Sequence, residues 1–139
     1  MPAPAYFETE KQIRFHHCDP AGIVFYPQFF VLFHELLEDW FDHGLKLHYA
    51  SLIAKERRGL PTAHIECDFK VPSKIGDIVR MRLQVLRLGT SSITIAVSLH
   101  AGEEVRLTAK QVLVLISLDD GRALPLPEDL RRRMAAFMA

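Results

Sequence analysis

The sequence predicts an α+β fold in which a curved, antiparallel, five-stranded sheet wraps around one long central helix. Three observations favour this fold class. One strand-like segment precedes a long helical segment, and four strand-like segments follow it. The turns between the later strands are short, which favours antiparallel pairing. The helical segment is apolar around most of its circumference, so it needs cover on several sides, and only the sheet can provide that cover.

The amino-terminal third is expected to form the first strand and the long helix. Residues 7–15 alternate with a period of two, as in a strand, and this run stops at the turn-forming residues 19–22. A helical pattern then extends from Pro27 to about Asp42. Proline suits the first position of a helix because no N–H is needed there, and Gly44 is expected to end the helix. A helix of ~16 residues is ~24 Å long, which matches the length of a sheet.

The rest of the chain predicts strands between two shorter helices, which we expect over residues 49–58 and after Pro127. Period-two alternation predicts four strands, at residues 64–71, 79–85, 93–99 and 105–116. In the last strand the apolar phase changes between Ala109 and Val112. Either a bulge lies near Lys110 and Gln111, or both faces of the strand are covered beyond them.

The composition favours one ordinary globular domain. The chain has 139 residues, which we assign to a single domain, 1–139, because no linker, repeat or low-complexity tract divides it. Its 17 basic residues balance its 17 acidic ones, which argues against nucleic acid as a partner. No apolar stretch approaches the ~20 residues needed to cross a membrane, and no secretory signal opens the chain. With two cysteines and no disulfide framework, the simplest expectation is a cytoplasmic protein.

A carboxylate lies just before the start of the long helix. Asp19 falls in the tight turn, and the helix begins soon after it. The free N–H groups and partial positive charge of a helix start can polarise a carbonyl group. Since Pro27 has no N–H, the donor must be a neighbour, with Tyr26 as the first candidate and Gln28 as the second. Asp19 can then attack the carbonyl carbon or take a proton from water, although Asp-Pro is also a common turn opener.

The run from Cys18 to Pro27, CDPAGIVFYP, closely resembles the amino-terminal motif of the 4-hydroxybenzoyl-CoA thioesterases. More loosely, it is similar to the wider acyl-CoA thioesterase family of hotdog proteins. The resemblance implies that Asp19 is the catalytic carboxylate and that the Tyr26 backbone amide binds the thioester oxygen. It also implies a hotdog fold, a homodimer, often a tetramer made of two dimers, active sites at the dimer interface and no cofactor.

Residues around this motif are expected to border the substrate. Gly22 allows an unusual backbone angle or a close approach of substrate, while Phe25 and Pro27 lie at the helix start. Glu35, on the polar stripe of the helix, matches a position that is often acidic in related enzymes. It could orient water or substrate, or it could be a buried hydrogen-bonded carboxylate or one half of a helix–sheet pair.

The phosphates of CoA require basic groups near the site. By resemblance, the turn that contains Arg87, Thr90 and Ser91 contacts the nucleotide or the pantetheine. The basic clusters at residues 55–58 and 131–133 are alternatives, although such runs usually form a solvated face. This turn, and His17 at a position that is often acidic in the family, depart from the 4-hydroxybenzoyl enzymes. An aromatic substrate therefore does not follow from the resemblance.

A metal site is not expected. The segment 34–38, HELLE, is similar to the zinc helix of metalloproteases, but Glu38 stands where that motif needs a second histidine. No clear third ligand accompanies it. His17 is badly placed to activate Cys18 as a nucleophile, since neighbours in an extended chain point in opposite directions.

Together, these observations predict an acyl-CoA thioesterase that releases a free carboxylate and CoA, with no cofactor beyond the CoA of its substrate. The alternative is a hotdog protein that binds acyl-CoA without hydrolysis, or a dehydratase or isomerase relative. A sheet wrapped around one helix leaves its edge strands uncovered, so we expect a homodimer and a homotetramer built from it. The spacing of residues does not identify the acyl group.

Overall fold

A computed structural model describes residues 5–138. Its main sheet has five antiparallel strands, which confirms the predicted number and pairing. In spatial order the strands are β1 (Phe7–Gln12), β4 (Ile78–Leu88), β5 (Ser92–Ala101), β6 (Glu104–Val114) and β3 (Thr62–Phe69). Strands β1 and β3 are therefore the two edges of the sheet.

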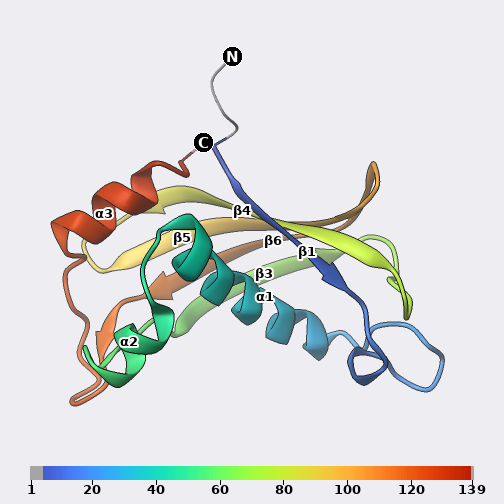
Figure 1. The fold of residues 1–139 in the computed structure, drawn as a ribbon, viewed down its shortest axis with the longest axis horizontal. Coiled ribbons are helices and arrows are strands. Elements are labelled where there is room, and N and C mark those ends of the chain that lie inside the picture. The colour runs from blue at the N-terminus through green and yellow to red at the C-terminus, as the bar shows by residue number, and fades with distance from the viewer. Residues whose placement is uncertain (1–4, 139) are drawn as a thin grey trace.

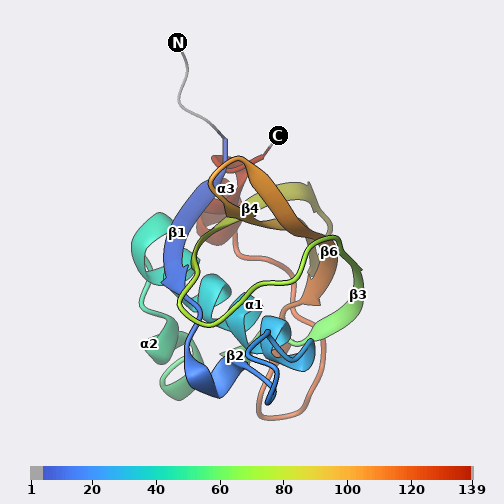
Figure 2. The ribbon, with the colours of Figure 1, turned by 90° about the vertical axis from the view of Figure 1, so that its right-hand side faces the viewer.

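Helix α1 (Pro27–Asp39) runs across the concave face of this sheet (Figure 1). Seen nearly end-on, the sheet curves over α1 from β1 on one side to β3 on the other (Figure 2). Alternate residues of the central strands, such as Leu83 and Ile95, are buried in the same cluster as Leu36 of the helix. This contact between the sheet and α1 forms the hydrophobic core.

The sheet does not cover α1 on as many sides as its apolar pattern led us to expect. Phe30 and Val31 are 37% and 49% exposed, and His34 is also exposed. Phe30 and His34 lie on the side of α1 that faces β3, at an edge of the sheet. A single copy of the chain therefore leaves one apolar face of its helix open.

The α-helix also ends earlier than predicted. It stops at Asp39, and a π-helical turn, η2 (Trp40–Gly44), continues it. Gly44 is the last residue of this turn, as expected, but its own backbone angle is not left-handed, and the left-handed residue beyond it is Lys46, with φ +59°. A Cβ atom on Gly44 would lie 2.7 Å from Cδ1 of Trp40. Glycine is needed here because the buried indole of Trp40 packs against the backbone.

The first strand is shorter than predicted. It ends at Gln12, and a short 3-10 turn, η1 (Phe15–His17), follows it. Ile13 leaves the sheet because its backbone bonds to the loop before β4. Its N–H donates to the Asp77 carbonyl at 2.8 Å, and its carbonyl accepts the Gly76 N–H at 2.8 Å. The remaining elements are α2 (Tyr49–Ala54), the paired strands β2 (Arg58–Gly59) and β7 (Ile116–Ser117), and α3 (Glu128–Ala135).

Strand β6 has no bulge at the position where the apolar phase changes. Its pairing with β5 continues through this region without a shift in register. Ala109 and Leu113 are buried on the inner face, so Gln111 between them also faces inward. Val112 and Val114, on the outer face, are partly covered. The structure thus supports the second interpretation, in which both faces of the strand are covered.

Candidate active site

Asp19 lies in a tight loop that joins η1 to α1. Cys18 and Val24 form an antiparallel bridge, and inside it the Asp19 N–H donates to the Ile23 carbonyl at 3.0 Å. The Asp19 side chain accepts a hydrogen bond from the Ala21 N–H through Oδ1 at 2.9 Å. Its second carboxylate oxygen has no hydrogen bond to any residue in the described range 5–138. The loop therefore holds Asp19 through its backbone and one oxygen and leaves the other oxygen available.

The segment between β3 and β4, residues 70–77, forms backbone hydrogen bonds with this loop and supports it. The Val24 N–H donates to the Ser73 carbonyl at 2.9 Å, and the Ile75 N–H donates to the Gly22 carbonyl at 3.0 Å. Gly22 has φ +79°, a left-handed angle that strains any side-chain-bearing residue. A Cβ atom on Gly22 would still be 3.9 Å from the nearest atom of Ile75. The backbone angle, and not crowding, therefore explains the glycine.

Arg106 of β6 forms hydrogen bonds that connect the segment 70–77 to the sheet. Its Nη1 donates to Asp77 Oδ2 at 2.9 Å, to Ser73 Oγ at 3.2 Å and to the Pro72 carbonyl at 3.1 Å. The Lys74 N–H also donates to the Asp77 carboxylate, and this bond together with Arg106 lowers the pKa of Asp77. No sequence motif indicated Arg106 or Asp77, because the contacts join residues that are far apart in the chain.

Tyr26 presents a free amide at the start of α1. The Phe25 N–H donates to the His17 carbonyl at 3.0 Å, and the Gln28 N–H donates to the Phe25 carbonyl at 2.8 Å. Pro27, the first residue of α1, has no N–H. Within residues 5–138, no acceptor takes the Tyr26 N–H. The first candidate donor is therefore available to a substrate oxygen, whereas Gln28 is already engaged.

His17 is buried beneath the loop, and its Nδ1 accepts the Arg14 N–H at 2.9 Å. Burial and the neighbouring His16 lower the pKa of His17, which favours its neutral form. Burial and the charge of Asp19 raise the pKa of the Cys18 thiol. A protonated thiol is a poor nucleophile, so this segment offers the Asp19 carboxylate and not Cys18 for attack.

Glu35 is paired with the sheet. Its carboxylate lies 3.2 Å from Lys11 Nζ on β1, and Asp39 lies 3.0 Å from the same nitrogen. This is the helix–sheet pair, one of the alternatives for this residue. Glu35 and His17 line a hollow on the β1 side of α1. Phe30 lies on the side of α1 that faces β3, so Glu35 is on a different face of the helix.

Aromatic rings surround the start of α1. Phe25 and Tyr26 are 50% and 59% exposed. Phe69, at the end of β3, has its ring centroid 6.3 Å from that of Tyr26 and 6.5 Å from that of Phe30. The sequence did not indicate Phe69, because it is distant from the motif and resembles any other apolar strand residue.

The turn expected to contact CoA lies at the other end of the sheet. In Figure 1 the β4–β5 hairpin turn lies near α3, whereas the loop before α1 lies beyond the opposite end of β4. Arg131 of α3 donates to the Gly89 carbonyl in this turn at 2.8 Å. A single copy of the chain therefore does not bring Asp19 together with Arg87, Thr90 and Ser91.

His34, in the zinc-helix-like segment, contacts Glu38 at 3.4 Å. No cluster of three or more His, Cys, Asp or Glu side chains that could hold a metal ion occurs within residues 5–138. Over the same residues, no helix has the length and apolar character required to span a membrane.

The sequence is similar to that of known thioesterases over most of its length. A family model described as the thioesterase-like superfamily matches residues 13–134. A 1,4-dihydroxy-2-naphthoyl-CoA hydrolase from Synechocystis is 27% identical over 124 residues, which cover 88% of this chain and 89% of that protein.

Solved structures show the same fold. The crystal structure of a 1,4-dihydroxy-2-naphthoyl-CoA thioesterase from Synechocystis matches with a TM-score of 0.83 at 24% identity, covering 94% of this chain and 96% of that one. A mutant 4-hydroxybenzoyl-CoA thioesterase in complex with 4-hydroxybenzoyl-CoA matches with a TM-score of 0.83 at 19% identity, covering 94% and 99%. Together with the family match, these structures confirm the predicted hotdog fold.

Proposed function

Because the chain belongs to the thioesterase-like superfamily, we propose that it hydrolyses acyl-CoA thioesters to a free carboxylate and CoA through Asp19 and the backbone N–H of Tyr26. The similarity to CoA hydrolases over nearly the whole chain supports this activity. One observation carries the assignment of residues. The Tyr26 N–H is free at the start of α1, between Phe25, whose amide is already hydrogen-bonded, and Pro27, which has no N–H, and it follows directly on the Asp19 loop.

In this proposal the Tyr26 N–H binds the thioester oxygen. This hydrogen bond and the positive end of α1 stabilise the negative charge that the oxygen gains during attack. Asp19 either attacks the carbonyl carbon, forming a mixed anhydride that water then hydrolyses, or takes a proton from an attacking water molecule. By both routes the C–S bond breaks, the CoA thiolate leaves and is protonated by solvent, and no metal or other cofactor is required.

The complete site is proposed to need two copies of the chain, paired through β3. This strand is an edge of the sheet and most of its residues are exposed, and an unpaired edge strand tends to pair with another strand. Antiparallel pairing about a two-fold axis would place the Arg87 turn of one copy at the same end as the Asp19 loop of the other. The exposed ring of Phe69 and the open face of α1 fit such an interface. Assembly of two dimers into a tetramer stays a prediction.

An aromatic acyl group fits this site. The substrates named for similar proteins, 1,4-dihydroxy-2-naphthoyl-CoA and 4-hydroxybenzoyl-CoA, have aromatic acyl groups. In this chain the rings of Tyr26, Phe69 and Phe30 stand next to one another beside the helix start. Such rings pack favourably against another ring in edge-to-face or offset arrangements.

Thiol release from a panel of aromatic and aliphatic acyl-CoAs, followed with a colorimetric thiol reagent, tests the activity. In Asp19→Asn, the side-chain oxygen that accepts the Ala21 N–H is kept, so the loop should keep its shape. The amide neither attacks a carbonyl nor accepts a proton. We therefore expect kcat to fall by about 10²–10⁴-fold.

Asp120→Asn is the matched control, because Asp120 Oδ1 accepts the Arg122 N–H at 2.9 Å in the same kind of turn. It should retain wild-type activity. Wild-type activity in Asp19→Asn would overturn the assignment of this residue. Tight binding of acyl-CoA by the wild type with no thiol release would support the alternative, a protein that binds acyl-CoA without hydrolysis.

A further inference from the structure

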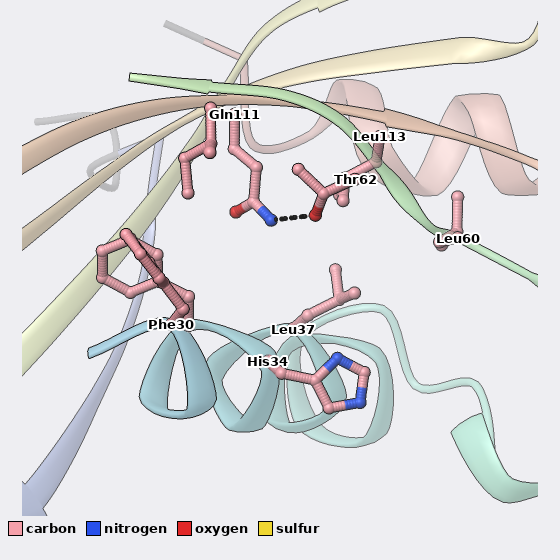
Figure 3. Close-up of a pocket in the computed structure, with 9 residues that line it drawn as sticks. Phe30, His34, Leu37, Leu60, Thr62, Gln111 and Leu113 are labelled. Carbon is pink, nitrogen blue, oxygen red and sulfur yellow. Dashed lines mark hydrogen bonds between the residues drawn. The ribbon is translucent and has the colours of Figure 1, made fainter. Parts of the chain in front are cut away.

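A cavity of about 340 Å³ lies between α1 and strands β3 and β6 (Figure 3). Phe30, Phe33 and Leu37 form its helix wall, since residues three, four and seven apart share one face of a helix. The rings of Phe30 and Phe33 are 5.7 Å apart at an interplanar angle of 65°. The sheet wall is also largely apolar and contains Leu60, Ile65 and Leu113. These walls suit a flat apolar group.

Gln111 interrupts this apolar lining. In Figure 3 its amide points from β6 toward α1, with the nitrogen on the side of Thr62 and the oxygen on the side of Phe30. Gln111 Nε2 donates to Thr62 Oγ1 at 2.6 Å, which fixes the orientation of the amide. Among residues 5–138, no donor reaches Gln111 Oε1. The oxygen is therefore free to accept a hydrogen bond from a guest in the cavity.

The charges of the side chains that line the cavity limit which chemical groups can bind in it. Of residues 5–138, no Lys or Arg lines the cavity, so the described part of the chain offers no cation there to a carboxylate or phosphate. His34, a histidine of this lining, lies at an exposed position and contacts Glu38. A purely apolar guest would strip water from Gln111 Oε1 and leave this oxygen without a hydrogen-bond partner, which is unfavourable. A neutral guest with a hydroxyl donor avoids that cost.

The cavity begins next to the proposed catalytic groups. Phe30 is one helical turn beyond Tyr26, or ~6 Å along the axis at 1.5 Å per residue. Phe69 packs near both rings, so aromatic side chains border the path from the helix start to the cavity. An acyl group whose carbonyl oxygen lies at the Tyr26 N–H can therefore extend along α1 toward Gln111.

We propose that this cavity binds the acyl group and that Gln111, oriented by Thr62, selects aromatic acyl groups that carry a hydroxyl substituent. The inference rests on the proposed thioesterase function and deepens it, because it assigns substrate selection to two residues outside the motif. The ring packs against Phe30 and Phe33, and its hydroxyl group donates to Gln111 Oε1.

Matched pairs of thioesters test the proposal. The hydroxybenzoyl-CoA isomers are compared with benzoyl-CoA, and hydroxynaphthoyl-CoAs with naphthoyl-CoA, by kcat/KM for thiol release. The wild type should prefer the best hydroxylated ester by about tenfold or more, as expected when an acceptor that the bound guest covers would otherwise lose its partner. Gln111→Leu should lower kcat/KM for the hydroxylated ester and leave little or no preference.

Two further variants make the comparison specific. Gln84→Leu is the matched control, because Gln84 alternates with the buried Leu83 and Val85 and so lies on the outer face of the sheet. It should keep the wild-type preference. Thr62→Val removes the group that orients the Gln111 amide, with little change in volume. It should reduce the preference for the hydroxylated esters. If Gln111→Leu does not fold, the preference measured in Thr62→Val tests the proposal in its place.

Hydrolysis of both members of each pair with equal efficiency by the wild type would overturn this inference alone. The same holds if Gln111→Leu and Thr62→Val keep the wild-type preference. Thiol release from none of the esters would overturn the proposed function and this inference with it. The failures of the two proposals are therefore distinguishable.

Discussion

The hydrogen bond from the Arg14 N–H to His17 Nδ1 requires an unprotonated ring nitrogen. Burial and the neighbouring His16 lower the pKa of His17, which favours the neutral ring. The carbonyl of the same residue accepts the Phe25 N–H, so His17 connects η1 to the residue before Tyr26. Protonation of His17 should therefore loosen the backbone that presents the proposed catalytic groups.

We expect His17 to make the protein less stable in acid. Its pKa is near ~6.5 in an unfolded chain and lower in the folded protein. Above about pH 6.5 both states are neutral and the full contribution of this group is present. As the pH falls from there toward the folded pKa, only the unfolded chain binds the proton, so the free energy of unfolding decreases. Urea unfolding at several pH values should show a smaller acid loss in His17→Gln than in the wild type.

His43→Gln is a suitable control, because His43 is exposed on η2. Its acid loss should equal that of the wild type. If His17→Gln lost as much stability on acidification as the wild type does, the buried neutral imidazole would not be the cause.

Among the structural elements, the segment between β3 and β4 connects three parts of the fold through hydrogen bonds. It bonds to the Asp19 loop through Ser73 and Ile75, to the end of β1 through Gly76, and to β6 through Arg106. The Arg106 side chain is 13% exposed, so its charged hydrogen bonds are largely shielded from water. The position of Asp19 therefore depends on a strand at the far side of the sheet from β1.

Arg106→Met should lower both stability and activity. Loss of the charged hydrogen bonds to Asp77 and Ser73 is expected to reduce the free energy of unfolding by about 2 kcal/mol. A small displacement of the Asp19 loop should lower kcat by roughly tenfold or more, with a smaller change in KM. Denaturant unfolding and steady-state kinetics measure the two effects.

Arg80→Met serves as the comparison, because Arg80 donates to the Gly102 carbonyl and lies near Glu8, away from the loop. It should leave kcat unchanged. Equal kcat values for Arg106→Met and the wild type would show that the segment supports the fold but does not position Asp19.

At the scale of the whole molecule, the two ends of the sheet carry different parts of the proposed site. The loop before α1, which contains Asp19, lies at one end and the β4–β5 turn at the other, so one copy cannot unite them (Figure 1). Pairing through β3 would bring the Asp19 loop of one copy close to the Arg87 turn of the other. This would happen twice in each dimer, once at each end of the joined sheet.

Subunit complementation tests this arrangement. We expect Asp19→Asn and Arg87→Ala each to have low activity. When they are unfolded and refolded together, half of the dimers contain one copy of each, and one site in each mixed dimer has both native residues. Activity should recover to at most about a quarter of the wild-type value.

The control is a mixture of Asp19→Asn with the double variant that carries both substitutions. No dimer in this mixture has a site with both native residues, so activity should stay low. Light scattering should report dimers or tetramers in every sample. Dimers without recovery of activity in the first mixture would contradict a site shared between copies.

The strands and the main helix were predictable because each has a local hydrophobic period. The alternation in β4 and β5 and the apolar face of α1 record which side of each element is buried. Errors arose where distant contacts overrode the local pattern. β1 ends early because Ile13 bonds to the loop before β4, and α1 changes to a π-helical turn where Trp40 packs against Gly44.

The part of the site that is local in the chain could be predicted from the sequence: Asp19 and Gly22 in one tight turn, and Tyr26 before a proline that starts a helix. Neighbouring residues decide these features, so a short motif is sufficient to indicate them. Only the folded chain shows that Gln111 faces the cavity and that Arg106 bonds to the segment that supports the Asp19 loop. Those outcomes depend on strand register and sheet curvature, which arise from contacts between residues that no local pattern connects.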